Sequence, residues 1–389
     1  MKIVRLLTCS VAFLCFSVAT SHARLGDSES VIAVSVMPSP PFIEHANDGT
    51  QALNFDFSLR NGSAEALSLN RVEVSAYDTA GRLEYRRFLD SNGHPPSIEL
   101  LGAVKLPAHG RLTVFNPFSN LPSWITLSRL HYAFYFYRDR NAQDEAANEE
   151  RIPIDYDRSV GVDVRPLVYH TKTPLQLPLH GALIVWDGHD AYAHHRRFDI
   201  STVEAEREGI RENSNLYAYD FVPVHGASAA MYDGLPYDSK HWYGYGAPEY
   251  APGSGVVVSV ANDIPEIRYN GHRVVHPTIP DNKDPYGLGN HVIINHEDGE
   301  FSVLMHMQPG SVLVHLGEHV AQGQLLGRLG DSGDAIFPHL HYALWNGPTP
   351  LIARGIPSSF EHFKRIVGAS RITVKRGQVD SGDIVQALP

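Results

Sequence analysis

Short runs of β-branched and aromatic residues, separated by turn residues, fill the first half of the chain. The runs lie at 31–36, 53–59, 66–77, 83–88, 110–114 and 130–137, with turns such as Asn61-Gly62, Ala80-Gly81 and Asn92-Gly93 between them. Such residues favour strands, and strands at this spacing are typical of an antiparallel sandwich. We therefore expect an immunoglobulin-like β-sandwich over residues 24–165, although no Cys-Trp-Cys pattern is present.

The second half, residues 166–389, also has a strand pattern, and one strand contains an acid. Around 217–221 the aromatic residues Tyr217, Tyr219 and Phe221 share one face, while Asp220 shares the other face with Ala218. A carboxylate in an apolar strand is costly unless it is paired or binds a cation. Asp220 is therefore predicted either to bind a metal or to pair with a nearby arginine.

Long loops separate the strands of this half. Residues 232–246 are rich in Tyr, Gly and His, and residues 262–286 contain four prolines. Loops of this length around a β core often form substrate grooves. The aromatic loop is expected either to contact a ligand or to pack on its own rings, and residues 352–363 are predicted to be helical.

A His-x-His pair near the end of this half is the strongest chemical signal. In a strand, His339 and His341 would point to the same face, with Cα atoms roughly 6–7 Å apart. One imidazole could bind a metal while the other reaches the water that the metal holds. The alternative is two structural histidines. The preceding Gly330–Asp334 run and Pro338 favour a site, because they form a tight loop that leads the pair into a strand.

Composition narrows the chemistry and the compartment. The first 23 residues resemble a signal peptide, with Lys2 and Arg5 before an apolar run and Ser21-His22-Ala23 as a cleavage site; an uncleaved anchor is the alternative. Both cysteines lie in this segment, so the mature chain would have no cysteine nucleophile or ligand. Of the 22 histidines, 17 follow residue 165, which places any metal chemistry in the second half.

Charge argues against two kinds of partner. The formal net charge of −11 becomes more negative when the signal segment is removed, and an acidic protein is a poor match for nucleic acid. No other stretch is long and apolar enough to span a bilayer, so no stable membrane insertion is expected after cleavage.

Several ordered motifs carry a family resemblance over roughly residues 166–365. They are G-x-P-x-x-A-P at 246–252, G-N-x-V-x-I-x-H at 289–296, H-x-x-P-G-S at 306–311, V-x-x-G-Q-x-L-G at 320–327, G-x-S-G at 330–333 and P-H-L-H at 338–341. Together they resemble the lysostaphin-like (LytM-type) zinc endopeptidases of bacterial cell walls. The chain looks like a divergent branch of that family with an N-terminal β domain.

The resemblance implies a mostly antiparallel β peptidase domain with a zinc ion held by two histidines and one aspartate. His341 and Asp220 match two ligands, and His306 and His339 match the pair of histidines beside the reacting water. His306 could instead be a core histidine between Met305 and Met307.

The remaining ligand departs from the family pattern. The family places a histidine four residues before the aspartate, where this chain has Leu216. If the site is intact, a histidine must come from the preceding loop, and we expect His195. The alternatives are His194, His189 or a degenerate site without this ligand. Arg196 and Arg197 are expected to point outward or to hold an acid such as Asp190 or Asp199.

These expectations imply a function. The chain would be a zinc metalloendopeptidase that hydrolyses cross-linking peptides of peptidoglycan, in the periplasm or outside a bacterial cell. One alternative is a family member that has lost its metal and its catalysis, and that binds the cell wall or activates an amidase. A biotinyl or lipoyl carrier is the other, but it needs a lysine at its hairpin tip, and residues 329–337 contain none.

Overall fold

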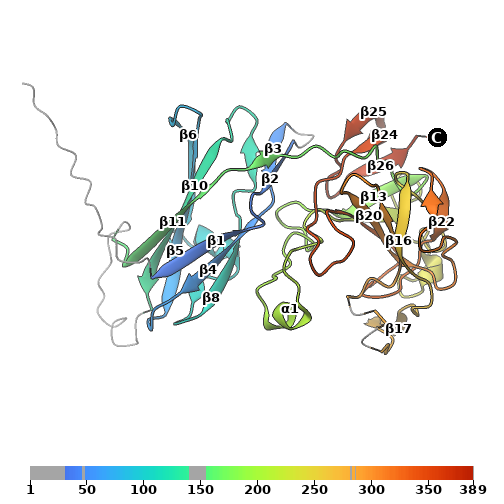
Figure 1. Cartoon of the computed structure of the whole chain (residues 1–389), viewed down its shortest axis with the longest axis horizontal. Coiled ribbons are helices and arrows are strands. Elements are labelled where there is room, and N and C mark those ends of the chain that lie inside the picture. The colour runs from blue at the N-terminus through green and yellow to red at the C-terminus, as the bar shows by residue number, and fades with distance from the viewer. Residues whose placement is uncertain (1–30, 46–48, 140–154, 281–282, 285, 389) are drawn as a thin grey trace, which may run out of the picture.

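The computed structural model describes residues 31–45, 49–139, 155–280, 283–284 and 286–388. Nearly all of its regular structure is β strand, and strand pairing is antiparallel with few exceptions (Figure 1). The predicted all-β, mostly antiparallel fold is thus confirmed. The expected signal segment, residues 1–23, lies outside the described residues. Within them, no helix has the length and apolar character needed to cross a membrane.

The N-terminal strands form three small sheets around one core. The first sheet has the order β1 (Ile32–Met37), β4 (Asp56–Asn61), β8 (Arg111–Phe115); the second has the order β11 (Arg158–Val164), β10 (Arg129–Arg138), β5 (Leu67–Tyr77), β6 (Leu83–Asp90), with β7 (Lys105–Leu106) beside β5. The third has the order β12 (Leu167–Val168), β2 (Phe42–His45), β3 (Thr50–Leu53), β9 (Asn120–Pro122). Alternating apolar residues such as Phe57, Tyr132 and Phe134 fill the core between them. The immunoglobulin-like topology of this region stays a prediction.

A ten-stranded antiparallel sheet dominates the second half. Its order is β21 (His319–Val320), β16 (Gly255–Ala261), β19 (Asn290–Asn295), β20 (Phe301–Met307), β23 (Leu340–Trp345), β14 (Tyr219–Pro223), β13 (Ala182–Asp187), β26 (Ile384–Ala387), β24 (Phe360–Val367), β25 (Ser370–Gly377). Two small hairpin-like sheets pair β15 (Pro248–Tyr250) with β22 (Leu325–Arg328) and β17 (Arg268–Asn270) with β18 (Arg273–Val275). The described helices are short: α1 (Val203–Glu208), η1 (Ser97–Leu101) and η2 (Ser239–His241).

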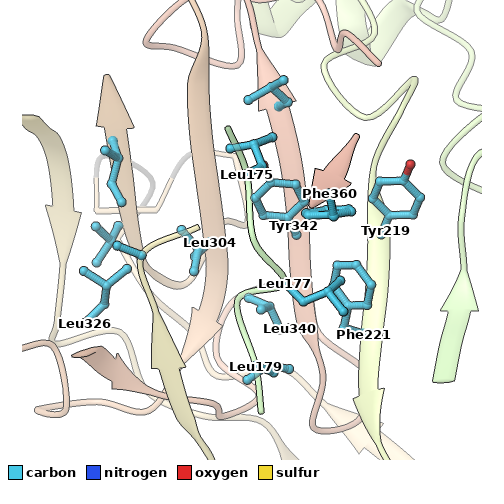
Figure 2. Packing of buried hydrophobic residues seen from close by; sticks show 14 of the residues in the cluster. Leu175, Leu177, Leu179, Tyr219, Phe221, Leu304, Leu326, Leu340, Tyr342 and Phe360 are labelled. Atoms are coloured by element: carbon cyan, nitrogen blue, oxygen red, sulfur yellow. The ribbon is translucent and has the colours of Figure 1, made fainter. Parts of the chain in front are cut away.

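The two faces of the large sheet pack against different hydrophobic clusters. On one face Leu340 and Tyr342 pack into the main core, and Figure 2 shows the segment from Leu175 to Leu179 lying over these side chains. On the opposite face Ala343 and Trp345 belong to a smaller cluster. Since strand residues alternate, His341 shares the face of Ala343 and Trp345. The smaller cluster therefore lies beside the polar site, on the same face of the sheet.

The predicted helix at 352–363 is wrong. Residues 360–367 form strand β24, which pairs with β25 on one side and β26 on the other. Gly355 and Pro357 disfavour a helix in this stretch, and pairing with distant strands decides its structure. The 262–286 loop also contains the β17–β18 hairpin.

Candidate metal centre

Strand register brings the acid and the His-x-His pair together. Asp220 in β14 is directly opposite His341 in β23, and His341 is opposite Met305 in β20 on its other side. His339 immediately precedes β23 and faces the same way as His341. Three adjacent strands thus hold the predicted residues on one face of the sheet.

Three imidazole nitrogens surround one carboxylate oxygen. Asp220 Oδ1 lies 3.4 Å from His195 Nε2, 3.3 Å from His339 Nε2 and 3.2 Å from His341 Nδ1. All four residues are buried. Burial alone would raise the pKa of Asp220, but the imidazoles of His339 and His195 hold it well below its usual range. The carboxylate is therefore ionised among these groups.

The loop before α1 brings His195 directly beside Asp220, and His194 lies in the same cluster of possible ligand atoms. His195 Nδ1 lies 3.1 Å from the carbonyl oxygen of Gly188, which can only accept a hydrogen bond, so the proton is on Nδ1 and the Nε2 lone pair faces Asp220. His194 turns its exposed ring to Asp187 at 2.6 Å. His189 contacts Glu44 in β2 instead. Of the three histidines considered from the sequence, His195 is the one next to Asp220.

His306 reaches the site through a break in strand alternation. By regular alternation it would face away from Met305, toward the main core. Its φ of +66° and a register shift between β19 and β20 turn the side chain round. Its ring then lies 4.9 Å from that of His339, centroid to centroid. Bulges and left-handed residues cluster at functional sites because they re-aim side chains, so this geometry speaks against a core role for His306.

The family-like motifs build the support for His306. Its Nδ1 lies 2.8 Å from the carbonyl oxygen of Ser332, in the G-x-S-G segment. The Ser332 hydroxyl donates to the carbonyl of Met307 at 2.8 Å and accepts from the backbone N–H of Asn290 at 2.9 Å. The Asn290 amide in turn donates to the carbonyl of Ile264. This fully buried network fixes the carbonyl that orients His306.

The geometry fits a zinc ion. Ligands 2.0–2.2 Å from a tetrahedral zinc lie about 3.4 Å from one another. The separations of His195 Nε2 and His341 Nδ1 from Asp220 Oδ1 have this size. Among the residues that the structure describes, Asp220 Oδ1 and His341 Nε2 are also buried without a hydrogen-bond partner, which a bound cation or its water would provide. His339 Nε2 is equally close to Asp220, so distance alone admits it as a ligand too.

A cleft of about 750 Å³ opens onto these residues. Trp186 and Phe337 form part of its wall, with ring centroids 5.5 Å apart. Trp242, from the aromatic 232–246 loop, stacks on Phe337 at 4.9 Å. The loop therefore supports the cleft through Phe337, and its Trp242 ring is itself buried.

Sequence reasoning missed three groups that hold the site. The Gly188 carbonyl sets the tautomer of His195, and the Asn213 amide donates to the backbone carbonyl of His195 at 3.1 Å. The third group is the Asp56 carboxylate of β4. Arg196 was expected to point outward or to hold an acid such as Asp190 or Asp199; it does hold an acid, but the acid is Asp56 and the pair is buried. A turn carbonyl and a distant carboxylate leave no local signal in the sequence.

Comparison with known proteins gives a family for part of the chain. Residues 242–352 match the model of Peptidase family M23, a range that includes His306, His339 and His341 but begins after His195 and Asp220. Over 112 residues the chain is 32% identical to peptidoglycan DD-endopeptidase ShyA of Vibrio cholerae serotype O1, which is 29% of this chain and 19% of that protein. It is 44% identical over 54 residues to peptidoglycan DD-endopeptidase ShyC of the same organism, which is 14% of this chain and 12% of that protein.

Solved structures also resemble part of the chain. The catalytic domain of the antimicrobial peptidase lysostaphin from Staphylococcus simulans aligns with a TM-score of 0.21 and 22% identity, over 32% of this chain and 84% of that one. The sequence matches span less than a fifth of the length of each curated relative. Within the second half of the chain, residues 242–352 therefore resemble peptidase family M23.

Proposed function

We propose that this chain is a secreted zinc-dependent endopeptidase that hydrolyses the cross-linking peptides of bacterial peptidoglycan, in the periplasm or outside the cell. The convergence of His195, Asp220 and His341 at the floor of the cleft carries the proposal. Two further imidazoles, His306 and His339, lie beside them. The peptidase-family match and the similarity to two peptidoglycan DD-endopeptidases support the reaction and the substrate class.

In the proposed mechanism, His195 through Nε2, Asp220 through Oδ1 and His341 through Nδ1 would hold the metal. When bound, zinc acts as a Lewis acid that lowers the pKa of a water molecule to about 7. His306 and His339 each donate the Nδ1 proton to a backbone carbonyl, so each presents an Nε2 lone pair to the site. Either imidazole can therefore accept a proton, and once protonated it can donate to the carbonyl oxygen or to the leaving amine.

Zinc stoichiometry on purified protein tests the metal assignment. Wild type should bind one zinc per chain, and His195→Ala, Asp220→Ala and His341→Ala should each abolish or greatly weaken binding. His194→Ala is the matched control, since its exposed ring is directed to Asp187. Retained zinc in His195→Ala would refute that ligand assignment.

Digestion of purified peptidoglycan, with and without a chelator, tests the reaction. Mass analysis of the released fragments should show cleavage within the cross-linking peptides, lost with the chelator and restored by zinc. A protein that binds no zinc and releases no fragments would instead support the alternative of a family member that has lost its metal and its catalysis.

A further inference from the structure

The segment that carries His195 lies between the two halves of the chain. In Figure 1 the green segment leading to α1 stands between the blue-green sandwich and the orange-red sheet. Thr113 in β8 donates to Asp199 at 2.9 Å, and the guanidinium of Arg197 lies 4.9 Å from the ring centroid of Phe115. The loop of the candidate metal centre thus packs on N-terminal strands as well as on its own sheet.

The residue after His195 forms the tightest of these contacts. Arg196 Nη1 lies 2.6 Å from Oδ1 and 2.7 Å from Oδ2 of Asp56, and Nη2 donates to the carbonyl oxygen of Phe55 at 2.6 Å. Only 1% of Arg196 and 6% of Asp56 is exposed. The guanidinium is planar and rigid, so its N–H groups can donate to all three acceptor atoms in only one orientation. The position of the Arg196 side chain is therefore fixed.

A second contact holds the start of the same loop. Glu44 in β2 lies 3.1 Å from His189 Nε2, and it also accepts hydrogen bonds from the Asn54 and Gln378 amides. His189 follows Gly188, whose carbonyl orients His195. Both the residue beside the ligand and the residue beside its orienting carbonyl are therefore held by N-terminal carboxylates.

This arrangement matters because metal sites tolerate little displacement. Ligand-to-metal distances must fall within about 0.2 Å of their ideal values. Mutation of a residue that orients a ligand typically lowers metal affinity 10–100-fold. His195 comes from a loop, whereas Asp220 and His341 come from paired strands of the sheet. The loop ligand therefore depends most on external support.

We propose that Asp56, acting through Arg196, is a positioning residue for His195, so the N-terminal β domain sets the metal affinity of the peptidase domain. The inference rests on the proposed function only in taking His195 as a zinc ligand. It gives the N-terminal strands a part in the site itself, beyond that of an accessory domain.

The test is zinc affinity of the full chain, measured by competition with a chelating dye. Asp56→Asn keeps the shape of the side chain but removes its charge, and it should weaken zinc binding about 10–100-fold. Glu73→Gln is the matched control, because it breaks a comparable bond to Arg71 (2.7 Å) in β5, away from the site. Its zinc affinity should equal that of wild type.

A double variant separates positioning from stability. Replacing a buried ion pair with apolar residues often preserves stability, whereas removing one partner does not. Asp56→Leu/Arg196→Met should therefore unfold at about the wild-type temperature yet still bind zinc weakly. Full zinc affinity in this folded double variant, or in Asp56→Asn, would overturn the inference. A wild-type protein without zinc would overturn the proposed function, and the inference with it.

Discussion

His306 donates a hydrogen bond from Nδ1 to the backbone carbonyl of Ser332, 2.8 Å away. His339 forms the same kind of bond with the carbonyl of Phe337, also at 2.8 Å. Because a carbonyl only accepts, each ring has a proton on Nδ1, and Nε2 is the nitrogen that remains to take up or give a proton. The backbone of one loop, residues 332–337, thereby sets the tautomer of two candidate catalytic groups.

His306→Ala and His339→Ala should retain zinc and lose turnover. A general acid or base typically contributes 10²–10⁴-fold to rate, so kcat should fall by about that factor in each variant. Zinc stoichiometry and kcat on a soluble peptide measure the two effects separately. Loss of zinc in His339→Ala would instead move this residue into the ligand set, as its 3.3 Å distance from Asp220 permits.

Ser332→Ala should weaken both the fold and the activity. The variant leaves the buried Asn290 N–H and side chain without the hydroxyl that they contact at 2.9 and 3.1 Å. An unsatisfied buried group costs about 1–3 kcal/mol, measurable by denaturant unfolding. Turnover should fall as well, since the Ser332 carbonyl orients His306. Ser311→Ala is the control, because its hydroxyl contacts Arg328 near the surface; an equal loss there would contradict the argument.

Glu249→Met should stabilise the protein. Glu249 is fully buried, neither of its carboxyl oxygens has a hydrogen-bond partner in the described part of the chain, and burial raises its pKa well above the usual value. A buried polar group without a partner costs about 1–3 kcal/mol, and methionine has similar volume. The folded carboxyl binds its proton more tightly than the unfolded one, so wild-type stability falls as pH rises through and above the unfolded pKa. The gain in unfolding temperature should therefore be larger at pH 8 than at pH 5; a gain independent of pH would contradict this.

Asp331→Asn should change how stability depends on pH. Burial, opposed by a hydrogen bond from Ser239 and reinforced by Glu266, raises the pKa of Asp331 to about 7. Because the folded pKa exceeds the unfolded one, wild type loses stability as pH rises from about 4 to about 7, by at most ~1.4 kcal/mol per pH unit. Denaturant unfolding across this range should show a shallower slope for Asp331→Asn. Identical slopes would show that Asp331 is ionised in the folded protein throughout.

Much of the sheet could be predicted because its strands follow local alternation. The strands around Asp220 and after His339 were expected from apolar periodicity, and β14 and β23 have the expected faces. The helix prediction for 352–363 was wrong because β24 is stabilised by pairing with β25 and β26 rather than by its own sequence pattern. Long-range pairing of this kind is not encoded in a short window of sequence.

In the candidate site, too, some residues could be predicted from local sequence pattern and others depend on distant parts of the chain. Asp220, His339 and His341 were predicted from a strand pattern and a motif, and the structure brings their side chains together. The sequence could narrow the loop ligand to three histidines but could not rank them by geometry. The ranking depends on where the Gly188 carbonyl and the Asp56 carboxylate lie, and neither position follows from residues near His195.

The position of β26 has a consequence for the order of events during synthesis. This strand lies between β13 and β24, and Ala182 pairs with Gln386, roughly two hundred positions further along the chain. Closing so long a loop is entropically costly and slow, and the partner must first leave the ribosome. Strand β13, which leads into the His195 loop, therefore gains this neighbour only after residues near 385 have been made. The sheet edge at β13, from which the His195 loop departs, is thus completed late in synthesis.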